Sequence, residues 1–262
     1  MPIITISRGS YSRGKEVAEK VAAKLGYDCL SRDVVLEAAS QLHIPEVKLI
    51  RALHDAPNIV ERLIGGKEKY IAEFRNVLLN FLKKDNVVYH GLAGQFFLKG
   101  IPHVLKVRIL ADIEQRVIEE MEREAISEDE ARRILEKDDE ERRQWSLHLY
   151  GIDTWDPSLY NMVLKIGKLT VDCAVDIIFN AIKQPCFETT PEARQKLTDL
   201  ALIARLHSKI DKSLIYNISA SNDDVIIVLN APKKRQKELT SLVRSIADGI
   251  PDIKNVLIKF NP

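Results

Sequence analysis

The chain has few cysteines and few aromatic residues. Among 262 residues there are three cysteines, and Phe, Trp and Tyr together make up 6%. The cysteines, Cys29, Cys173 and Cys186, are too few and too scattered for a disulfide framework or a cysteine-based metal site. We therefore expect a protein of the cytoplasm, whose fold depends on a hydrophobic core.

An excess of charge of one sign and a long apolar run are also missing. Lys and Arg number 39 against 38 Asp and Glu, and the net charge is +1 at pH 7. This balance argues against a nucleic-acid-binding protein and against an acidic disordered tail. No apolar run approaches the ~18 residues of a membrane span. The start of the chain also lacks the basic-then-apolar pattern of a signal peptide.

Short apolar segments alternate with amphipathic ones over the first 183 residues. Strands are expected at 3–7, 86–89, 103–110 and 164–166, and helices at 15–25, 33–43, 57–83 and 170–182. Such alternation predicts an α/β domain whose parallel sheet is covered on both faces.

Residues 113–150 are rich in charge. The window 119–143 contains 12 acidic and 6 basic side chains. Ser127 and Glu130 form a capping box, which predicts a helix from Glu128 to about Trp145. By composition alone this segment is typical of a solvated helical hairpin. Its arginines gain a function only if an anion lies opposite them.

A second domain is expected after a linker at 184–190, where two threonines and a proline precede Pro191. Residues 191–262 predict the order helix, strand, strand, helix, strand, with a turn at 221–224. This small α+β (αββαβ) module contains 12 basic and 8 acidic residues. The excess is too mild to indicate a nucleic-acid grip.

The sharpest motif lies between the first strand and the first helix. Gly9-Ser10-Tyr11-Ser12-Arg13-Gly14-Lys15 fits the G-x-x-x-x-G-K part of a phosphate-binding loop. Backbone N–H groups at the first turn of a helix favour an anion, and Lys15 is expected to bridge the β- and γ-phosphates. We therefore predict that residues 9–16, through Glu16, bind ATP. The alternative is an ordinary strand-to-helix turn.

Glu16 stands where this motif normally has a Ser or Thr that binds Mg²⁺. A carboxylate can hold Mg²⁺ directly or through water, so Glu16 is the candidate metal ligand. Ser10 and Ser12 are the alternative sources of a hydroxyl.

The opening Ile4-Thr-Ile-Ser-Arg8, the loop ending Gly14-Lys15-Glu16 and the later Ser31-Arg32-Asp33 resemble the cytidylate-kinase-like family. The resemblance continues through 87–91, 102–107, 122–128, 139–142 and 156–160 and covers about residues 1–182. It implies a three-layer P-loop kinase fold with a five-stranded parallel sheet and a helical lid at 113–150. The implied reaction is transfer of the ATP γ-phosphoryl group to a phosphorylated acceptor.

The resemblance also implies which side chains contact phosphate. Lys15, Arg123 and Arg142 are assigned to phosphate clamping, and Asp139 is assigned to orienting an arginine. Arg116 is a weaker candidate, seven residues before Arg123 and therefore on the same helix face. For each arginine of the lid, a surface ion pair with an acidic neighbour is the alternative.

The acceptor side departs from the family. Cytidylate kinases carry Gly-Arg-Asp at the end of the third strand, where this chain has His90-Gly91-Leu92. Leucine cannot bind a phosphate, so CMP is not predicted as the acceptor. Arg32, Asp33, His90 and Gly91 are the candidate acceptor-binding residues, with a structural role as the alternative for His90.

The module at 191–262 resembles a BON domain, a small binding domain. Its expected partner is a ligand, a membrane surface or another protein, including a second copy of this chain. The basic run Lys233-Lys234-Arg235 stands at a helix start. It is expected either to contact an anionic surface or to form a solvated helix face. An alternative to the kinase is therefore a non-catalytic ATP sensor that signals through this module.

Overall fold

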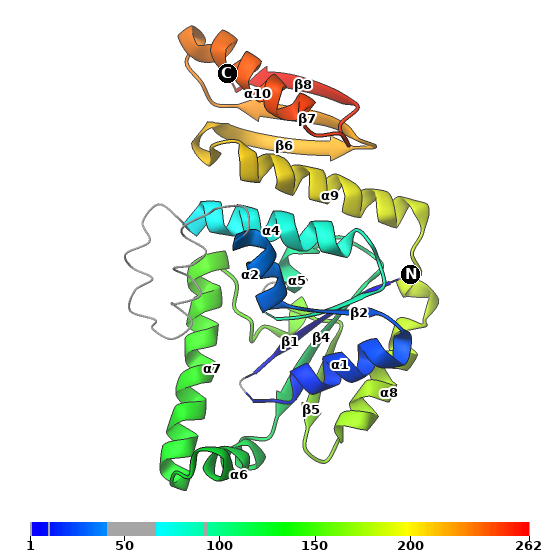
Figure 1. Ribbon diagram of the computed structural model, residues 1–262, viewed down its shortest axis with the longest axis vertical. Coiled ribbons are helices and arrows are strands. Elements are labelled where there is room, and N and C mark those ends of the chain that lie inside the picture. The colour runs from blue at the N-terminus through cyan, green and yellow to red at the C-terminus, as the bar shows by residue number, and fades with distance from the viewer. Residues whose placement is uncertain (1, 10, 41–66, 92–93, 262) are drawn as a thin grey trace. The chain divides into compact units, whose positions relative to one another are not determined.

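The computed structural model describes residues 2–9, 11–40, 67–91 and 94–261 (Figure 1). These residues form two compact units. The first takes the described residues of 1–35 and 84–189, and the second takes those of 36–83 and 190–262. No helix in the described part of the chain is long and apolar enough to cross a membrane.

The first unit is built on a parallel sheet. Its strands are β1 (Ile3–Arg8), β2 (Asp28–Ser31), β3 (Val87–His90), β4 (Val104–Ala111) and β5 (Met162–Ile166), in the order β2-β3-β1-β4-β5. All neighbouring pairs are parallel. The central strands are nearly continuous runs of buried residues, as expected for a sheet covered on both faces. The predicted fold class is confirmed.

Two helices cover one face of this sheet. Helices α1 (Gly14–Leu25) and α8 (Val171–Ile182) lie side by side there (Figure 1). Val17 and Ile178 pack with Ile6 and Val107 in one hydrophobic cluster. Thr5, which points to the opposite face, is also buried. The loop with the Gly9–Lys15 motif follows the carboxyl end of β1, and His90 and Gly91 lie at the carboxyl end of β3.

Short elements follow β2 and β3. Helix α2 (Arg32–Ser40) begins directly after β2, and α5 (Gly94–Phe97) follows β3. The predicted helix at 33–43 matches α2 as far as Ser40, and its residues 41–43 lie outside the described residues. Neither β2 nor α5 was expected from the sequence pattern.

The predicted lid consists of two helices, α6 (Ile113–Glu124) and α7 (Glu128–Tyr150). Ser127 caps α7 by accepting a hydrogen bond from the Glu130 N–H, so the predicted start is confirmed. The predicted end near Trp145 is wrong. The helix continues to Tyr150 because Gly151, in the left-handed conformation (φ 67°), supplies the cap.

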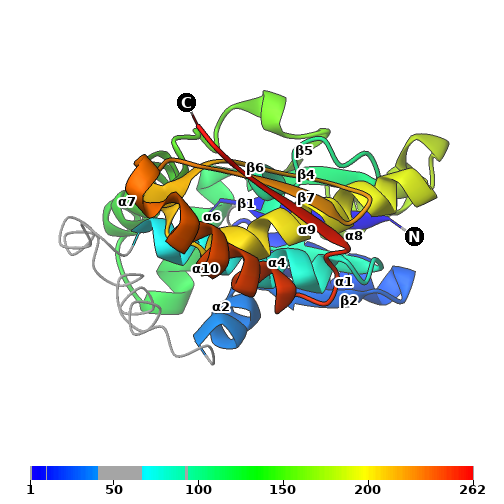
Figure 2. The ribbon, with the colours of Figure 1, turned by 90° about the horizontal axis from the view of Figure 1, so that it is seen from above.

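The second unit contains α4 (Lys67–Leu82), α9 (Pro191–Lys209), β6 (Ile215–Ser221), β7 (Asp224–Leu229), α10 (Gln236–Asp248) and β8 (Asn255–Phe260). Strand β6 pairs with β7 antiparallel, and β7 pairs with β8 parallel. Helices α9 and α10 cover one face of this sheet, with Leu206 and Val243 in its core (Figure 2). The order αββαβ is as predicted.

Helix α4 also belongs to the second unit, where it packs against α9. Residues 57–66 of the helical segment predicted at 57–83 lie outside the described residues. The predicted domain limits, 1–183 and 191–262, stay a prediction. Short 3₁₀ turns complete the chain: η2 (Pro157–Leu159), η3 (Pro185–Phe187), η4 (Lys212–Leu214) and η5 (Lys233–Arg235).

Candidate active site

The loop between β1 and α1 is tightly turned. Tyr11 and Arg13 adopt the left-handed conformation, with φ of 47° and 57°, and α1 begins at Gly14 directly afterwards. The side chain of Arg13 does not cap the helix. The first N–H groups of α1 have no partner inside the helix, so this end offers donors and a positive dipole end to an anion.

Ser12 fastens the loop to the sheet. Its hydroxyl is fully buried and lies 3.0 Å from the Gly9 carbonyl oxygen and 3.2 Å from the Ile109 carbonyl oxygen, to which it donates. The Gly9 N–H also donates to Ile109, at 3.3 Å. The Ser12 hydroxyl is thus engaged by backbone acceptors, which gives it a structural task. Ser10, the other candidate hydroxyl, lies outside the described residues.

Lys15 and Glu16 both form ion pairs along α1. The Lys15 Nζ lies 3.7 Å from a Glu19 carboxylate oxygen, and 64% of the Lys15 side chain is exposed. Glu16 lies 3.2 Å from the Lys20 Nζ, which also contacts Asp172 of α8. No group of three or more potential ligands for a metal ion occurs among the described residues. Glu16 as a Mg²⁺ ligand stays a prediction.

Arg8, the last residue of β1, packs across the start of α1. A Cβ added to Gly14 would lie 2.6 Å from the Arg8 Cβ and 3.0 Å from its Cδ. The Arg8 Nε is buried and has no hydrogen-bond partner within the described part of the chain. Burial lowers the pKa of Arg8, and the nearby charge of Arg142 lowers it further.

Helix α6 contacts the loop through two pairs of side chains. Arg13 forms an ion pair with Glu119. The guanidinium carbon of Arg123 lies 3.9 Å from the centre of the Tyr11 ring, which is cation–π geometry. Arg123 also pairs with Glu120 on its own helix. The structure thus brings Arg123 beside the predicted phosphate loop.

Arg116 reaches the loop through Asp139. Its Nη1 lies 2.8 Å from the Asp139 Oδ2, which joins α6 to α7. The other carboxylate oxygen of Asp139 lies 3.5 Å from where a Cβ on Gly9 would stand. Arg116 is 6% exposed, and its Nε and Nη2 are buried with no hydrogen-bond partner among the residues described. The Asp139 carboxylate therefore holds one guanidinium nitrogen of Arg116, and its role in orienting an arginine at the site stays a prediction.

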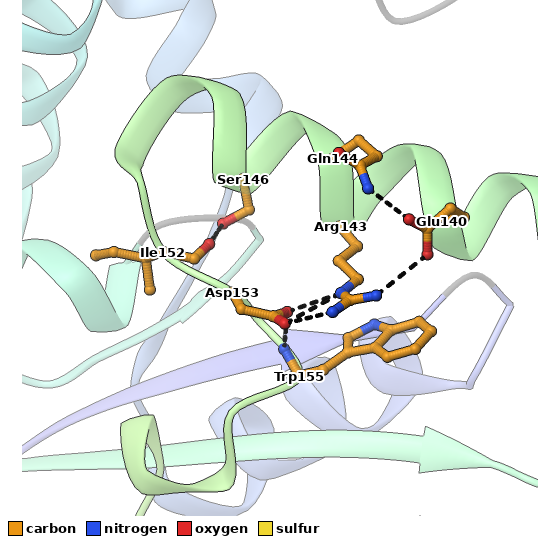
Figure 3. A network of polar contacts seen from close by, with 7 residues as sticks. All are labelled: Glu140, Arg143, Gln144, Ser146, Ile152, Asp153 and Trp155. Atoms are coloured by element: carbon orange, nitrogen blue, oxygen red, sulfur yellow. Dashed lines mark hydrogen bonds and ion pairs between the residues drawn. The ribbon is translucent and has the colours of Figure 1, made fainter.

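One turn further along α7 than Asp139, Arg143 fixes the helix to the segment that follows. Its guanidinium donates three hydrogen bonds to the Asp153 carboxylate at 2.8–3.1 Å and stacks on Trp155 at 4.6 Å (Figure 3). This pairing lowers the pKa of Asp153. Ser146 donates to the Ile152 carbonyl oxygen at 2.7 Å. Arg143 is therefore an anchor for the lid, next to the predicted phosphate ligand Arg142.

The candidate acceptor residues meet at the ends of β2 and β3. The His90 side chain is buried, and burial followed by the nearby charge of Arg8 lowers its pKa, so the imidazole is neutral at pH 7. A Cβ on Gly91 would lie 2.8 Å from the Tyr89 hydroxyl and 2.9 Å from the Arg32 Cβ. Glycine at this position lets Arg32 approach β3. The charge of Asp33 also acts on both Arg8 and His90.

The donors around the loop fit a polyphosphate. The uncapped start of α1 and the buried, unpartnered N–H groups of Arg8 and Arg116 are donors without acceptors in the described structure. A buried donor of this kind costs free energy unless a ligand or water accepts from it. For Mg²⁺, one or two carboxylates and the substrate phosphates are sufficient, so Glu16 is compatible with this role.

Sequence reasoning missed two residues of this site. Arg8 was noted within the opening motif but received no role, although a basic residue between a strand and a Gly-containing loop is a usable signal. Tyr160 was noted only as part of a motif. Its hydroxyl lies 3.0 Å from the Thr154 carbonyl oxygen, 3.3 Å from the Ser7 hydroxyl and 3.2 Å from the Gln95 amide nitrogen. It therefore ties the segment after the lid to β1.

Comparison with known proteins agrees with this geometry. The profile of the "Cytidylate kinase-like family" matches residues 3–168. A protein of Archaeoglobus fulgidus named "Cytidylate kinase" is 31% identical over 185 residues, which are 69% of this chain and 94% of that protein. A "Cytidylate kinase" of Sulfolobus acidocaldarius is 26% identical over 182 residues, again 69% and 94% of the two chains.

A solved structure shares the fold. The crystal structure of an uncharacterized protein from Eubacterium ventriosum superimposes with a TM-score of 0.55 at 22% identity, and the match covers 70% of this chain and 99% of that one. The family match extends from β1 beyond β5, through both the loop and the lid helices. The chain belongs to the cytidylate kinase-like family.

Proposed function

We propose that this protein is an ATP-dependent phosphotransferase of the nucleoside monophosphate kinase type. It would transfer the γ-phosphoryl group of ATP to a nucleotide or a similar phosphorylated small molecule. Two relatives named cytidylate kinase support this class of reaction. The observation that carries the proposal is the uncapped start of α1, beside a loop that arginines approach from β1 and α6.

The side chains divide the work of phosphoryl transfer. Such a transfer needs donor and acceptor held in line, negative charge neutralised and water excluded. The α1 N–H groups would hold the ATP phosphates, and Arg123 and Arg142 would neutralise the charge on the transferred group. Asp139 holds Arg116 close to Gly9. ATP supplies the phosphoryl group when it is bound.

The acceptor is proposed to lie beside Arg32, Asp33, His90 and Gly91. A neutral His90 accepts or donates a hydrogen bond but adds no positive charge near pH 7. Arg32, whose guanidinium lies 5.8 Å from the Trp145 ring centre, would therefore supply the charge for an acceptor phosphate. Because the Gly-Arg-Asp of cytidylate kinases is replaced here by His90-Gly91-Leu92, the proposal does not assign CMP as the acceptor.

The test is ADP release from ATP and Mg²⁺ with a panel of acceptors. The panel contains the nucleoside monophosphates and, separately, phosphorylated sugars. Turnover above the ATP-only background, lost in Arg142→Gln and kept in Arg133→Gln, would support the kinase. Arg133 is a matched control because it lies on the same helix and is exposed. ATP binding without turnover on any acceptor would instead favour the non-catalytic sensor.

A further inference from the structure

Four residues lie in one row across the sheet near the carboxyl ends of its strands. Ser7 of β1 is paired in register with Arg108 of β4. On the other side of β1, the Gly91 N–H donates to the Ile6 carbonyl oxygen at 3.2 Å, which places Gly91 next to Ser7. Arg32 follows β2 and packs on Gly91, where an added Cβ would lie 2.9 Å from the Arg32 Cβ. Two arginines therefore flank two small residues.

Ser7 and Arg108 point to the face of the sheet opposite α1 and α8. Their neighbours along the strands, Ile6 and Val107, belong to the hydrophobic cluster under those helices, and successive side chains of a strand point to opposite faces. The Tyr160 hydroxyl donates to the Ser7 hydroxyl at 3.3 Å and accepts from the Arg108 Nη1 at 3.4 Å. Arg108 is thus positioned beside the strand that leads into the phosphate loop.

Arg108 is a buried cation without a carboxylate partner. Its side chain is nine-tenths buried, with 8% of the residue exposed. Its contacts among the described residues are with Tyr160, through the long hydrogen bond to the hydroxyl and through the ring, whose centre lies 5.7 Å from the guanidinium carbon. Buried charges in proteins are normally paired, and a neutral hydroxyl compensates a guanidinium only in part.

The acidic group whose charge interacts with Arg108 is already engaged. Asp153 is that group, and the guanidinium of Arg143 donates three hydrogen bonds to its carboxylate at 2.8–3.1 Å. Arg143 is also the first cause of the lowered pKa of Asp153, whereas the charge of Arg108 contributes least. Asp153 therefore leaves Arg108 with room for a further anion.

The segment after β3 supplies no cation to this row. Residues 91–94 read Gly-Leu-Ala-Gly, and His90 is neutral at pH 7 because its pKa is lowered. The positive charge comes from Arg32 and Arg108 at the two ends. Three strand spacings of about 4.8 Å place their backbones about 14 Å apart, a span that two long side chains can close around one phosphate. A guanidinium matches a phosphate with two parallel N–H donors.

We propose that Arg108 binds the phosphate group of the acceptor, on the opposite side from Arg32. This assignment rests on the proposed function. The phosphate would lie over Gly91 and Ser7 and would replace the long hydrogen bond from Arg108 to Tyr160. Because Ser7 directly precedes the last residue of β1 and the phosphate loop, an acceptor held there is next to the phosphates of the donor.

The test is a calorimetric titration of inorganic phosphate into the full-length chain saturated with Mg²⁺ and AMP-PNP, an ATP analogue that resists hydrolysis. The analogue fills the donor site, so phosphate reports on the acceptor site. Arg108→Met is expected to weaken phosphate binding by about 10-fold or more, the loss of a charged hydrogen-bond donor. Its dissociation constant for AMP-PNP should change by less than about 3-fold.

Lys106→Met is the matched control. Lys106 lies two residues earlier on β4, on the same face and half-buried, so the substitution also removes one cation from that face. It should change either dissociation constant by less than about 3-fold. Arg108→Lys keeps the charge without the two-nitrogen contact and should bind phosphate more tightly than Arg108→Met.

Thermal unfolding without ligand shows whether each variant is folded, and Arg108→Lys takes the place of Arg108→Met against wild type if the latter does not fold. Three results overturn the role of Arg108 alone: a folded Arg108 variant that binds phosphate as tightly as wild type, an equal loss in Lys106→Met, or an equal loss of AMP-PNP binding. Binding of AMP-PNP without phosphate in wild type overturns it too. A wild-type chain that does not bind AMP-PNP overturns the proposed function as well.

Discussion

Gly14 shows how one missing side chain shapes the loop. The closest heavy atom to an added Cβ would be the Arg8 Cβ at 2.6 Å, a distance at which backbone or side chain must move. Because that neighbour is the root of the side chain and not its flexible tip, the strain cannot be relieved by a rotamer change. The identity of residue 14 is therefore tied to that of residue 8.

We expect Gly14→Ala to lower the free energy of unfolding by about 1–3 kcal/mol, the usual cost of overpacking. Thermal or urea unfolding would measure it. Gly249→Ala is the matched control, since its added Cβ would meet its closest neighbour at an ordinary 3.5 Å and its φ is −78°. Equal stability of Gly14→Ala and wild type would contradict the close packing of Arg8 on the start of α1.

His90 predicts a pH dependence of stability. Its pKa is lowered from the ordinary 6.5, chiefly by burial and then by the charge of Arg8, while Lys15 lowers it further and Glu19 and Asp33 oppose the shift. The unfolded chain then binds a proton more readily than the folded chain. The stabilising contribution of neutral His90 is therefore present above about pH 6.5 and is lost as the pH falls through the lower, folded-state pKa.

We expect the melting temperature to fall between pH 7 and pH 5 in wild type and to fall less in His90→Asn. His148→Asn, at an exposed position of α7, serves as the control and should keep the wild-type slope. The readout is the slope of the melting temperature against pH, because the substitution also changes packing, and so the absolute melting temperature, at every pH. An identical slope in wild type and His90→Asn would refute the assignment.

At the scale of elements, ion pairs and a cation–π contact join the lid helices to each other and to the neighbouring segments. Near the loop, Arg123 stacks on Tyr11 and Arg116 joins α6 to α7 through Asp139. Four residues after Asp139 on α7, Arg143 binds Asp153 with two of its nitrogens (Figure 3). The middle of this 23-residue helix is thereby fixed by ion pairs, while its buried apolar side chains are few: Ala131, Leu135 and Leu149.

Arg143→Lys is expected to lower the melting temperature, because an ammonium group cannot reproduce the two-nitrogen contact with Asp153 or the stacking on Trp155. Calorimetric melting would measure the change. Arg133→Lys on the exposed side of α7 should leave the melting temperature within error. An unchanged melting temperature in Arg143→Lys would mean that the Asp153 contact contributes nothing to holding α7.

The sequence pattern predicted long elements better than short ones. Strand β2 was missed because only one of its four residues, Leu30, is fully buried, which leaves no periodicity to detect. Helix α5 has four residues, and its Gly94 is required by the Tyr89 ring, which an added Cβ would approach to 2.4 Å. Contacts of this kind arise between elements and leave no mark in a local pattern.

The candidate site was predictable only in part for the same reason. The loop was located from its glycines and its place after the first strand. The contact between Asp139 and Arg116 was not predicted, because the two residues lie on different helices and no local spacing relates them. The position of Arg8 depends on the approach of β1 to α1, which becomes visible only once the sheet is assembled.

At the scale of the whole molecule, the division into units does not follow the order of the chain. Helix α4, at residues 67–82, groups with residues 190–262 and packs against α9. The side chains of Phe74, Leu78 and Leu82 on α4 are fully or almost fully buried. The C-terminal module, whose resemblance to a BON domain stays a prediction, therefore shares its packing with a segment from the first third of the chain.

A chain truncated to residues 1–189 is expected to melt at a lower temperature than the full chain, because it lacks the α9 surface against which α4 packs. Circular dichroism would record the melting curves, and light scattering would detect association through the uncovered surface of α4. A full-length chain with Thr189→Ala at the cut site controls for local effects. An unchanged melting temperature would show that α4 does not depend on α9.

The carboxylates that already accompany the loop arginines have a consequence for ionic strength. Arg13 is paired with Glu119, and Arg123 with Glu120. When a phosphate binds to either arginine, that arginine exchanges its carboxylate partner for the phosphate. The number of close charge pairs therefore changes little. Dissolved salt weakens the old pair and the new one alike, so nucleotide affinity should vary less steeply with salt concentration than the count of arginines around the loop suggests.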